Sequence, residues 1–340
     1  MPPIVPATDG IDPNALRVLV TGFGPFDKYK ANPSWLAVKP LHNTVLYTDP
    51  PTDPVLPNDQ TAMITDEMED LLRRPQQIHI TALEVPVTYQ AVLSITPGLH
   101  ARPPVLPRPS DPTLAIPPPP ANGYDFIFHV GVAGRGPLRI ERLGHKNGYR
   151  MKDKDGEYAP IVHLPKDPLN DIAELELQRM ERMLGPPHGL QGPNHGPEVP
   201  EVVDIPPPPN RGFGKGYEQF ADELSTEIDV PKLVVHLKEN GIDQVYSSMD
   251  AGHYLCDFIF YCSLAEAKRG IAPQEKFKER SLSPPKSTPV LFLHVPPVDQ
   301  PLSTEQVTDA IQRIILYVCG RLHQPARPEG HPVTPPAVAD

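Results

Sequence analysis

The chain has 340 residues, a formal net charge of −11 at pH 7, three cysteines and 49 prolines. It has no block of basic residues, which argues against nucleic acid and anionic membranes as partners. No apolar run approaches the roughly 20 residues of a membrane span, and the first residues lack the pattern of a signal peptide. Three cysteines without metal-ligand spacing indicate a cytoplasmic protein free of disulfides, for which we expect no metal and no cofactor.

Proline is about three times as frequent as usual, and the excess is concentrated in a few segments. Such segments cannot enter the interior of a helix or sheet, so they predict surface insertions. We therefore expect an N-terminal tail over 1–14, a single α/β domain over 15–324 and a Pro-rich C-terminal tail over 325–340. The insertions are expected near 43–70, 97–122, 151–213 and 271–287.

Along the chain, short apolar runs alternate with helical periodicities. The predicted elements are, in order, a strand at 17–21, a helix opening at 32–33, a strand at 78–84, a helix from 89, a strand at 124–130, helices at 172–184 and 231–240, a strand at 244–246, a helix from 254 to about 268, a strand at 290–295 and a helix at 307–322. Ser303 and Gln306 match a capping box for the last helix. This alternation predicts a three-layer α/β/α sandwich around a largely parallel, mixed sheet.

Cys256 falls in the opening turns of the helix that follows the strand at 244–246. The unpaired N–H groups and the dipole at such a terminus favour a thiolate, which is the nucleophilic form of cysteine. The alternative is core packing, because free cysteine is among the most buried residue types, and Cys262 and Cys319 are assigned to the core. Cys256 becomes a candidate nucleophile only if a base and an orienting group lie near it.

In an open α/β sheet, functional residues gather beyond the carboxyl ends of the strands. By that rule Phe23 and Phe26, the segment Gly131–Glu141, Cys256 and His294 are expected to meet. His294 ends a buried strand before two prolines, where it could take the thiol proton, and a third group would fix its tautomer. A hydrogen-bonded core histidine and a solvated glutamate remain the alternatives.

Six segments in a fixed order carry a resemblance to a known family. They are Val18–Phe26 with Asn32–Trp35, Glu84–Tyr89, His129–Gly134, Glu141–Tyr149, Asp250–Asp257 and Phe292–Pro297. In this order they resemble the pyroglutamyl peptidase I family of cysteine peptidases, also called pyrrolidone-carboxylate peptidases. The resemblance covers the strands and helices of the domain and none of the Pro-rich insertions.

The resemblance implies a cysteine exopeptidase, an omega-peptidase that cleaves the amide bond after an N-terminal pyroglutamyl residue through an acyl-enzyme. It assigns the nucleophile to Cys256, the base to His294 and the orienting carboxylate to Glu141, with Arg150 as a possible oxyanion ligand. The implied substrate-binding residues are Phe23, Phe26, Gly131, Val132 and Tyr254. Asn32 is either a helix N-cap or a further substrate contact.

Pyroglutamyl peptides are the expected partners, and their terminal lactam is flat and uncharged. A site for it needs apolar walls and hydrogen bonds to one amide edge, which Phe26, Tyr254 and the main chain near Val132 could supply. Two alternatives remain open. One is a cysteine amidohydrolase for another small acyl amide. The other is a non-catalytic protein whose runs Pro117–Pro120 and Pro206–Pro209 bind SH3 or WW domains.

Overall fold

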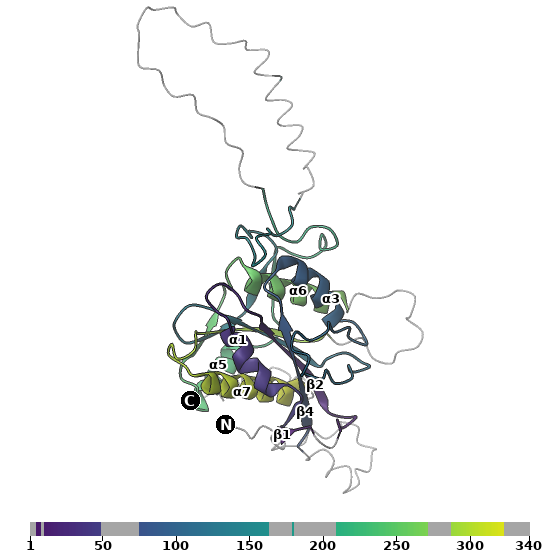
Figure 1. Ribbon diagram of the computed structural model, residues 1–340, viewed down its shortest axis with the longest axis vertical. Helices are drawn as coiled ribbons and strands as arrows, with labels where there is room; N and C mark the ends of the chain where they lie inside the picture. The colour runs from purple at the N-terminus through teal and green to yellow at the C-terminus, as the bar shows by residue number, and fades with distance from the viewer. Residues whose placement is uncertain are drawn as a thin grey trace, which may run out of the picture.

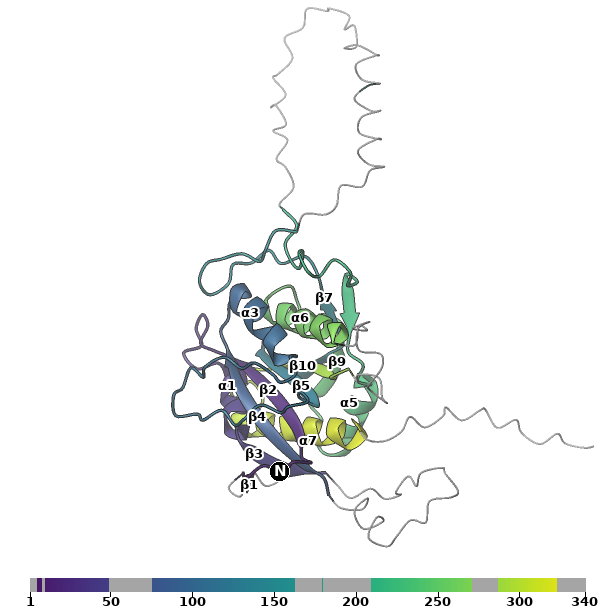
Figure 2. The same cartoon turned by 90° about the vertical axis from the view of Figure 1, so that its right-hand side faces the viewer.

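A mixed sheet of eight strands runs through the middle of the molecule, with helices on both faces (Figures 1 and 2). The computed structural model describes residues 5–7, 10–48, 75–162, 179, 209–270 and 287–322. The strand order is β1-β3-β4-β2-β5-β10-β6-β9, and β7 and β8 form a separate two-stranded sheet. This arrangement confirms the predicted three-layer α/β/α sandwich.

The strands are short, and the central ones are mostly apolar and buried along almost their whole length. Their bounds are β1 Val5–Pro6, β2 Leu16–Phe23, β3 Thr44–Tyr47, β4 Gln77–Val85, β5 Phe126–Val132, β6 Leu138–Glu141, β7 Leu143–His145, β8 Glu223–Ser225, β9 Val245–Ser248 and β10 Val290–Val295. All six residues of β10 are buried, as are the first six of β5. A strand covered by helices on both faces has no solvent side, so its sequence is continuously apolar instead of alternating.

The helices form two layers. Their bounds are α1 Pro33–Val38, followed by the 3₁₀ turn η1 Lys39–Leu41, α3 Tyr89–Leu99, α5 Val230–Glu239, α6 Leu255–Arg269 and α7 Thr304–Leu322. One apolar core joins α1, α5 and α7 to one face of the sheet, and a second core joins α3 and α6 to the other. The predicted capping box also forms, because the backbone N–H of Gln306 donates to Ser303 Oγ and that of Ser303 to Gln306 Oε1.

The direction of the strands changes on one side of the sheet. The pairs β4–β2, β2–β5 and β5–β10 are parallel, whereas β6 runs antiparallel to β10. β9 is parallel to β6, so it also runs against β10. The carboxyl ends of β6 and β9 therefore lie away from the edge where β2, β5 and β10 end.

Five short strands, β1, β3, β6, β7 and β8, lie where the sequence predicts none. β3 falls inside the expected insertion near 43–70 and pairs with β4, and β1 lies inside the expected tail and pairs with β3. β8 pairs with β7. The predicted helix at 172–184 falls outside the described residues except for residue 179, as do the C-terminal tail and most of the insertion near 271–287.

The Pro-rich segment near 97–122 lies on the surface as expected, but it is hydrogen-bonded to the sheet and to η1. Arg17 of β2 donates to the carbonyl of Pro118, and the Lys39 ammonium lies 2.9 Å from an Asp111 carboxylate oxygen. Within the first polyproline run, Pro118 and Pro119 are exposed whereas Pro120 is buried. The run Pro206–Pro209 lies outside the described residues apart from Pro209, so the SH3 or WW contact remains a prediction without support.

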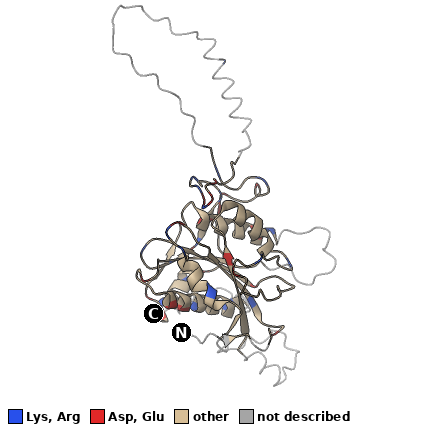
Figure 3. Cartoon of the chain, in the orientation of Figure 1, with Lys and Arg blue, Asp and Glu red and all other residues tan. Residues whose placement is uncertain are grey.

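The surface carries no feature of a membrane-spanning or polybasic protein in the part that is described. None of its helices is long and apolar enough to cross a membrane. Acidic and basic residues are interspersed over the helices and loops (Figure 3).

Asn32 uses its whole side chain to hold the start of α1 against the end of β2. Its Oδ1 accepts from the Ser34 N–H at 3.1 Å and from the Ser34 hydroxyl at 2.9 Å, and its Nδ2 donates to the carbonyl of Gly24. The residue is only 2 % exposed. Of its two possible roles, N-capping is therefore the one that the hydrogen bonds explain.

We expect Asn32→Ala to lower the free energy of unfolding by about 1–2 kcal/mol, because the N–H of Ser34 loses its acceptor and the buried carbonyl of Gly24 loses its donor. Asn32→Asp, which keeps the acceptor, should recover part of the loss. Urea titrations measure the free energy of unfolding of both variants, with Asn122→Ala in an exposed turn as the matched control. Equal stability of Asn32→Ala and the control would show that the cap contributes nothing.

Candidate active site

The candidate site is centred on β10 where this strand lies between β5 and β6. His294 is opposite Gly131 of β5 on one side and opposite Arg139 of β6 on the other. Phe292, two residues earlier, is opposite Glu141. Opposite residues in neighbouring strands project to the same face, and Phe292 belongs to the core that includes α6. All five residues therefore face the layer that contains α6.

A short hydrogen bond joins the two titratable groups of this cluster. His294 Nδ1 lies 2.6 Å from Glu141 Oε1, and the two residues are 4 % and 0 % exposed. The second carboxylate oxygen, Oε2, is buried and has no hydrogen-bond partner among the described residues. Arg139 Nε lies 3.9 Å from Oε1 and is the cation paired with this buried carboxylate. A buried charge needs such partners to be tolerated.

Cys256 approaches the same cluster from the helix layer. Tyr254 is the N-cap of α6 and Cys256 is its second residue, which confirms the predicted position in the opening turn. A Cβ atom built on Gly131 would lie 2.8 Å from Cys256 Sγ and 2.7 Å from Phe292 Cζ. Only glycine leaves room for the sulfur here, and because Gly131 is opposite His294, the thiol and the imidazole both adjoin this glycine.

The expected thiolate is not what the resting site favours. Burial raises the pKa of the Cys256 thiol to about 12, and the carboxylates of Glu141 and Asp257 add to this effect. Arg139 acts in the opposite direction and is too weak to reverse it. The effect expected from the helix terminus is therefore opposed by the desolvation of the anion, although the side chain itself is only partly buried.

The rule of strand exits describes only part of the cluster. Phe23, Gly131 and His294 do lie at or near the carboxyl ends of parallel strands. Glu141 and Cys256 do not fit the rule, because they end or follow strands that run against β10. Glu141 joins the cluster from the side as a cross-strand neighbour, and Cys256 joins it from above one face of the sheet.

The aromatic residues assigned to substrate binding divide into two kinds. The rings of Phe26 and Tyr254 are partly exposed, and their centroids lie 5.7 Å apart at an interplanar angle of 42°. The Tyr254 hydroxyl donates to the carbonyl of Lys152, which fixes that ring. Phe23, in contrast, is 4 % exposed and packs in the core with α3 and α6. Of these two aromatics, Phe26 is therefore accessible to a ligand, whereas Phe23 is buried.

The main chain at Gly131 and Val132 pairs with β10 but not with β2. The pairing of β5 with β2 ends at His129, whereas β5 continues to Val132 and its pairing with β10 reaches Val132. On the β2 side, the last three residues of β5 therefore extend beyond the paired region. Peptide groups at such an edge can bond a ligand.

Arg150, the predicted oxyanion residue, is exposed, and no hydrogen bond or ion pair joins it to the cluster in the described part of the chain. Arg139 is the basic residue beside Glu141, and it was not among the predicted site residues. The sequence could have indicated it, because Arg139 stands two residues before Glu141 and alternate residues of a strand lie on one face. A hollow of about 790 Å³ lies at the opposite edge of the sheet, lined by 10–17 and 115–123, and it contains none of the predicted site residues.

Comparison with known proteins finds similarity to pyroglutamyl peptidases. A family model described as "Pyroglutamyl peptidase" matches residues 16–93, a range that contains Phe23 and Phe26 and ends before Gly131. Pyroglutamyl-peptidase 1 of Mus musculus and that of Homo sapiens are each 23 % identical to the chain, with 90 % of this chain and 91 % of each relative covered. A crystal structure of pyroglutamyl peptidase I from Bacillus amyloliquefaciens aligns with a TM-score of 0.49 at 17 % identity, covering 90 % of this chain and 98 % of that one.

These matches confirm the predicted class, a hydrolase of the cysteine peptidase type. The chain is related to the pyroglutamyl peptidases, and the resemblance carried by its six ordered segments is confirmed.

Gly131 provides a test of the geometry that needs no change to a titratable group. Gly131→Ala would push the thiol or the Phe292 ring aside, because the added Cβ would lie under 3.0 Å from both. We expect this displacement to change the rate at which iodoacetamide alkylates Cys256, as followed by mass spectrometry. The matched control is Gly134→Ala, whose added Cβ meets no atom within 4 Å. Equal alkylation rates in the two folded variants would contradict the close approach.

Proposed function

We propose that the chain hydrolyses the amide bond after an N-terminal pyroglutamyl residue, with Cys256 as nucleophile, His294 as base and Glu141 as the group that orients His294. The observation that carries the proposal is the position of His294, which is hydrogen-bonded to Glu141 on one side and adjoins Gly131, beneath the Cys256 sulfur, on the other. A reducing compartment such as the cytoplasm suits a reactive thiol and three free cysteines.

The first step follows from the raised pKa of Cys256. Because the thiol holds its proton at neutral pH, attack on the pyroglutamyl carbonyl requires His294 to accept that proton as the S–C bond forms. With Nδ1 bonded to Glu141, Nε2 is the nitrogen that takes it. The imidazolium is then stabilised by the carboxylate 2.6 Å away.

The later steps use the same imidazole. His294 gives its proton to the departing peptide amine as the C–N bond breaks, which leaves a pyroglutamyl thioester on Cys256. It then takes a proton from a water molecule that attacks the thioester, and the thiol and free pyroglutamate are regenerated. The first N–H groups of α6 have no acceptor within the helix and are suited to hold the oxyanion, a role for which Arg150 is the earlier candidate.

The lactam would lie between Phe26 and Tyr254. These partly exposed rings offer apolar walls, and the unpaired edge of Gly131 and Val132 offers peptide groups for the lactam amide. A lactam carries no charge, so its pocket needs no acidic partner. Phe23, being buried, would shape the pocket from behind without touching the ring of the substrate.

A fluorogenic pyroglutamyl amide tests this proposal directly. We expect turnover by the full chain and a loss of at least about a thousandfold in Cys256→Ala. Cys262→Ala and Cys319→Ala are matched controls, because both thiols are buried in the core, and they should keep the activity. Turnover of other acyl amides alone would favour a different amidohydrolase, and no turnover of any amide would favour the binding protein.

Glu141→Gln separates orientation from substrate binding. It keeps a hydrogen-bonding side chain beside His294 but loses the charge that stabilises the imidazolium, so kcat should fall by about 100-fold or more. Binding of a non-reactive pyroglutamyl analogue, measured by calorimetry, should change little. Glu266→Gln, a buried glutamate near the other end of α6, is the matched control. Loss of analogue binding with normal turnover of bound substrate would make Glu141 a ligand-binding residue instead.

A further inference from the structure

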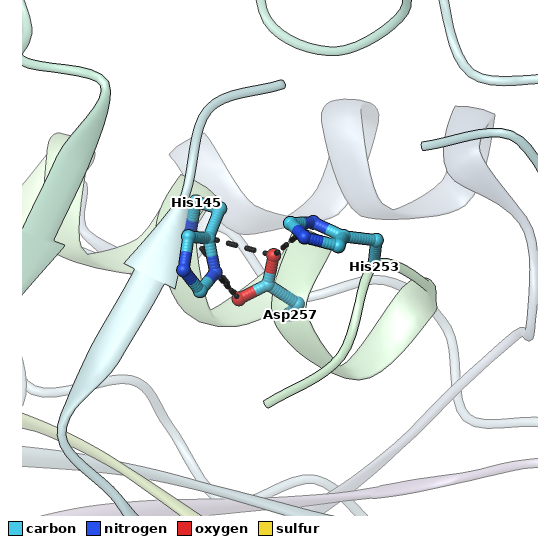
Figure 4. A group of neighbouring side chains, drawn as sticks. All are labelled: His145, His253 and Asp257. Atoms are coloured by element: carbon cyan, nitrogen blue, oxygen red, sulfur yellow. Dashed lines mark hydrogen bonds and ion pairs between the residues drawn. The ribbon is translucent and has the colours of Figure 1, made fainter. Parts of the chain in front are cut away.

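Three side chains that the proposed reaction does not use converge at the start of α6 (Figure 4). His145 ends β7, His253 precedes the N-cap of α6, and Asp257 lies in its first turn. The Asp257 carboxylate lies between the two rings, 3.1 Å from His145 Nδ1 and 3.9 Å from His253 Nδ1. One ligand atom from each residue can be chosen so that all lie within 4.8 Å of one another.

The donor atoms are those of a transition-metal site. Two imidazole nitrogens and one carboxylate oxygen are the protein ligands of many zinc sites, in which a water molecule fills the fourth position. The two rings lie 4.9 Å apart, centroid to centroid, so a small movement would bring three donors to about 2.0–2.2 Å from one ion. His253 is 49 % exposed and His145 18 %, which leaves a solvent side for entry and for a water ligand.

The surroundings hold the carboxylate and leave room for His253. Asp257 is fully buried and accepts from the Tyr149 hydroxyl at 2.8 Å and from the backbone N–H of His145 at 3.2 Å. Gly148 has φ +104, and an added Cβ there would lie 3.2 Å from His253 Nδ1. Hydrogen bonds to a ligating carboxylate are a usual feature of metal sites, because they orient the ligand.

We propose that His145, His253 and Asp257 bind one divalent transition-metal ion of the zinc class. Binding replaces the hydrogen bond between His145 Nδ1 and Asp257 by two bonds to the ion. The bound ring is neutral with its proton on Nε2, so a neutral ring exchanges its proton from Nδ1 to Nε2 through solvent, and a charged ring releases the Nδ1 proton. The bond from Tyr149 to Asp257 is retained. The mixture of nitrogen and oxygen donors favours Zn²⁺ or Co²⁺ over Mg²⁺ and Ca²⁺, which prefer all-oxygen ligands.

This site is distinct from the thiol of Cys256. Consecutive residues on a helix point about 100° apart, so Cys256 faces Gly131 whereas Asp257 faces β7. The sequence did not suggest the site, because His145 and Asp257 are 112 residues apart and the i,i+4 spacing of His253 and Asp257 is too common to indicate a site by itself. The folded chain alone brings the three donors together.

The test uses the full chain carrying Cys256→Ala, so that the thiol cannot bind metal. Zn²⁺ is titrated by calorimetry and Co²⁺ by visible absorption, and we expect one ion per chain. Adding His253→Ala should weaken binding by at least about tenfold, since even residues outside the ligand set change metal affinity by 10- to 100-fold. His236→Ala, on α5 at the other face of the sheet, is the matched control and should bind as the parent does.

His253 is the residue to change because its exposed ring is not part of the core, whereas loss of Asp257 could disturb folding. Thermal unfolding followed by circular dichroism checks each variant. Binding that is seen only with the thiol present would assign the ion to Cys256 and overturn the proposal. Equal affinity in His253→Ala and His236→Ala, or no binding by the Cys256→Ala parent, would overturn it as well.

Discussion

The site depends on one buried hydrogen bond, that between His294 and Glu141. A carboxylate with no exposed surface is costly unless nearby donors and cations compensate it, and here one imidazole and one guanidinium do so. The bond can form only because β6 runs antiparallel to β10, so that Glu141 lies two residues from His294 along the register. The reversal of strand direction thus has a chemical role, since a parallel neighbour of β10 would need a different register to supply the carboxylate.

Much of this fold could be predicted from local patterns. The largely buried strands β2, β4, β5 and β10 and the helix that carries Cys256 lie where apolar runs and helical spacing placed them. The pattern could not predict which strands pair with each other or in which direction they run. β3 and β8 are stabilised by partners distant in sequence, and the direction of β6 and β9 is a property of the whole sheet.

The residues of the candidate site could be predicted more readily than their burial, protonation and ion pairs. Cys256 and His294 were found from their places on a helix and a strand, whereas the protonation of the thiol is set by burial and by carboxylates on other elements. The burial of Phe23 was not predictable, because a ring at the end of a strand can turn either to solvent or to the core. Arg139 was missed because its ion pair with Glu141 depends on the side chains sharing one face of β6.

The raised pKa of Cys256 also affects how the chain meets oxidants. Peroxides react with the thiolate, so a thiol that keeps its proton at rest is oxidised slowly to the sulfenic acid. In the reaction proposed for it, the sulfur becomes strongly nucleophilic only during transfer of its proton to His294. Desolvation therefore protects the sulfur from oxidants while it lowers the resting reactivity, and the reactivity of the cysteine is confined to the time when an acyl group is beside it.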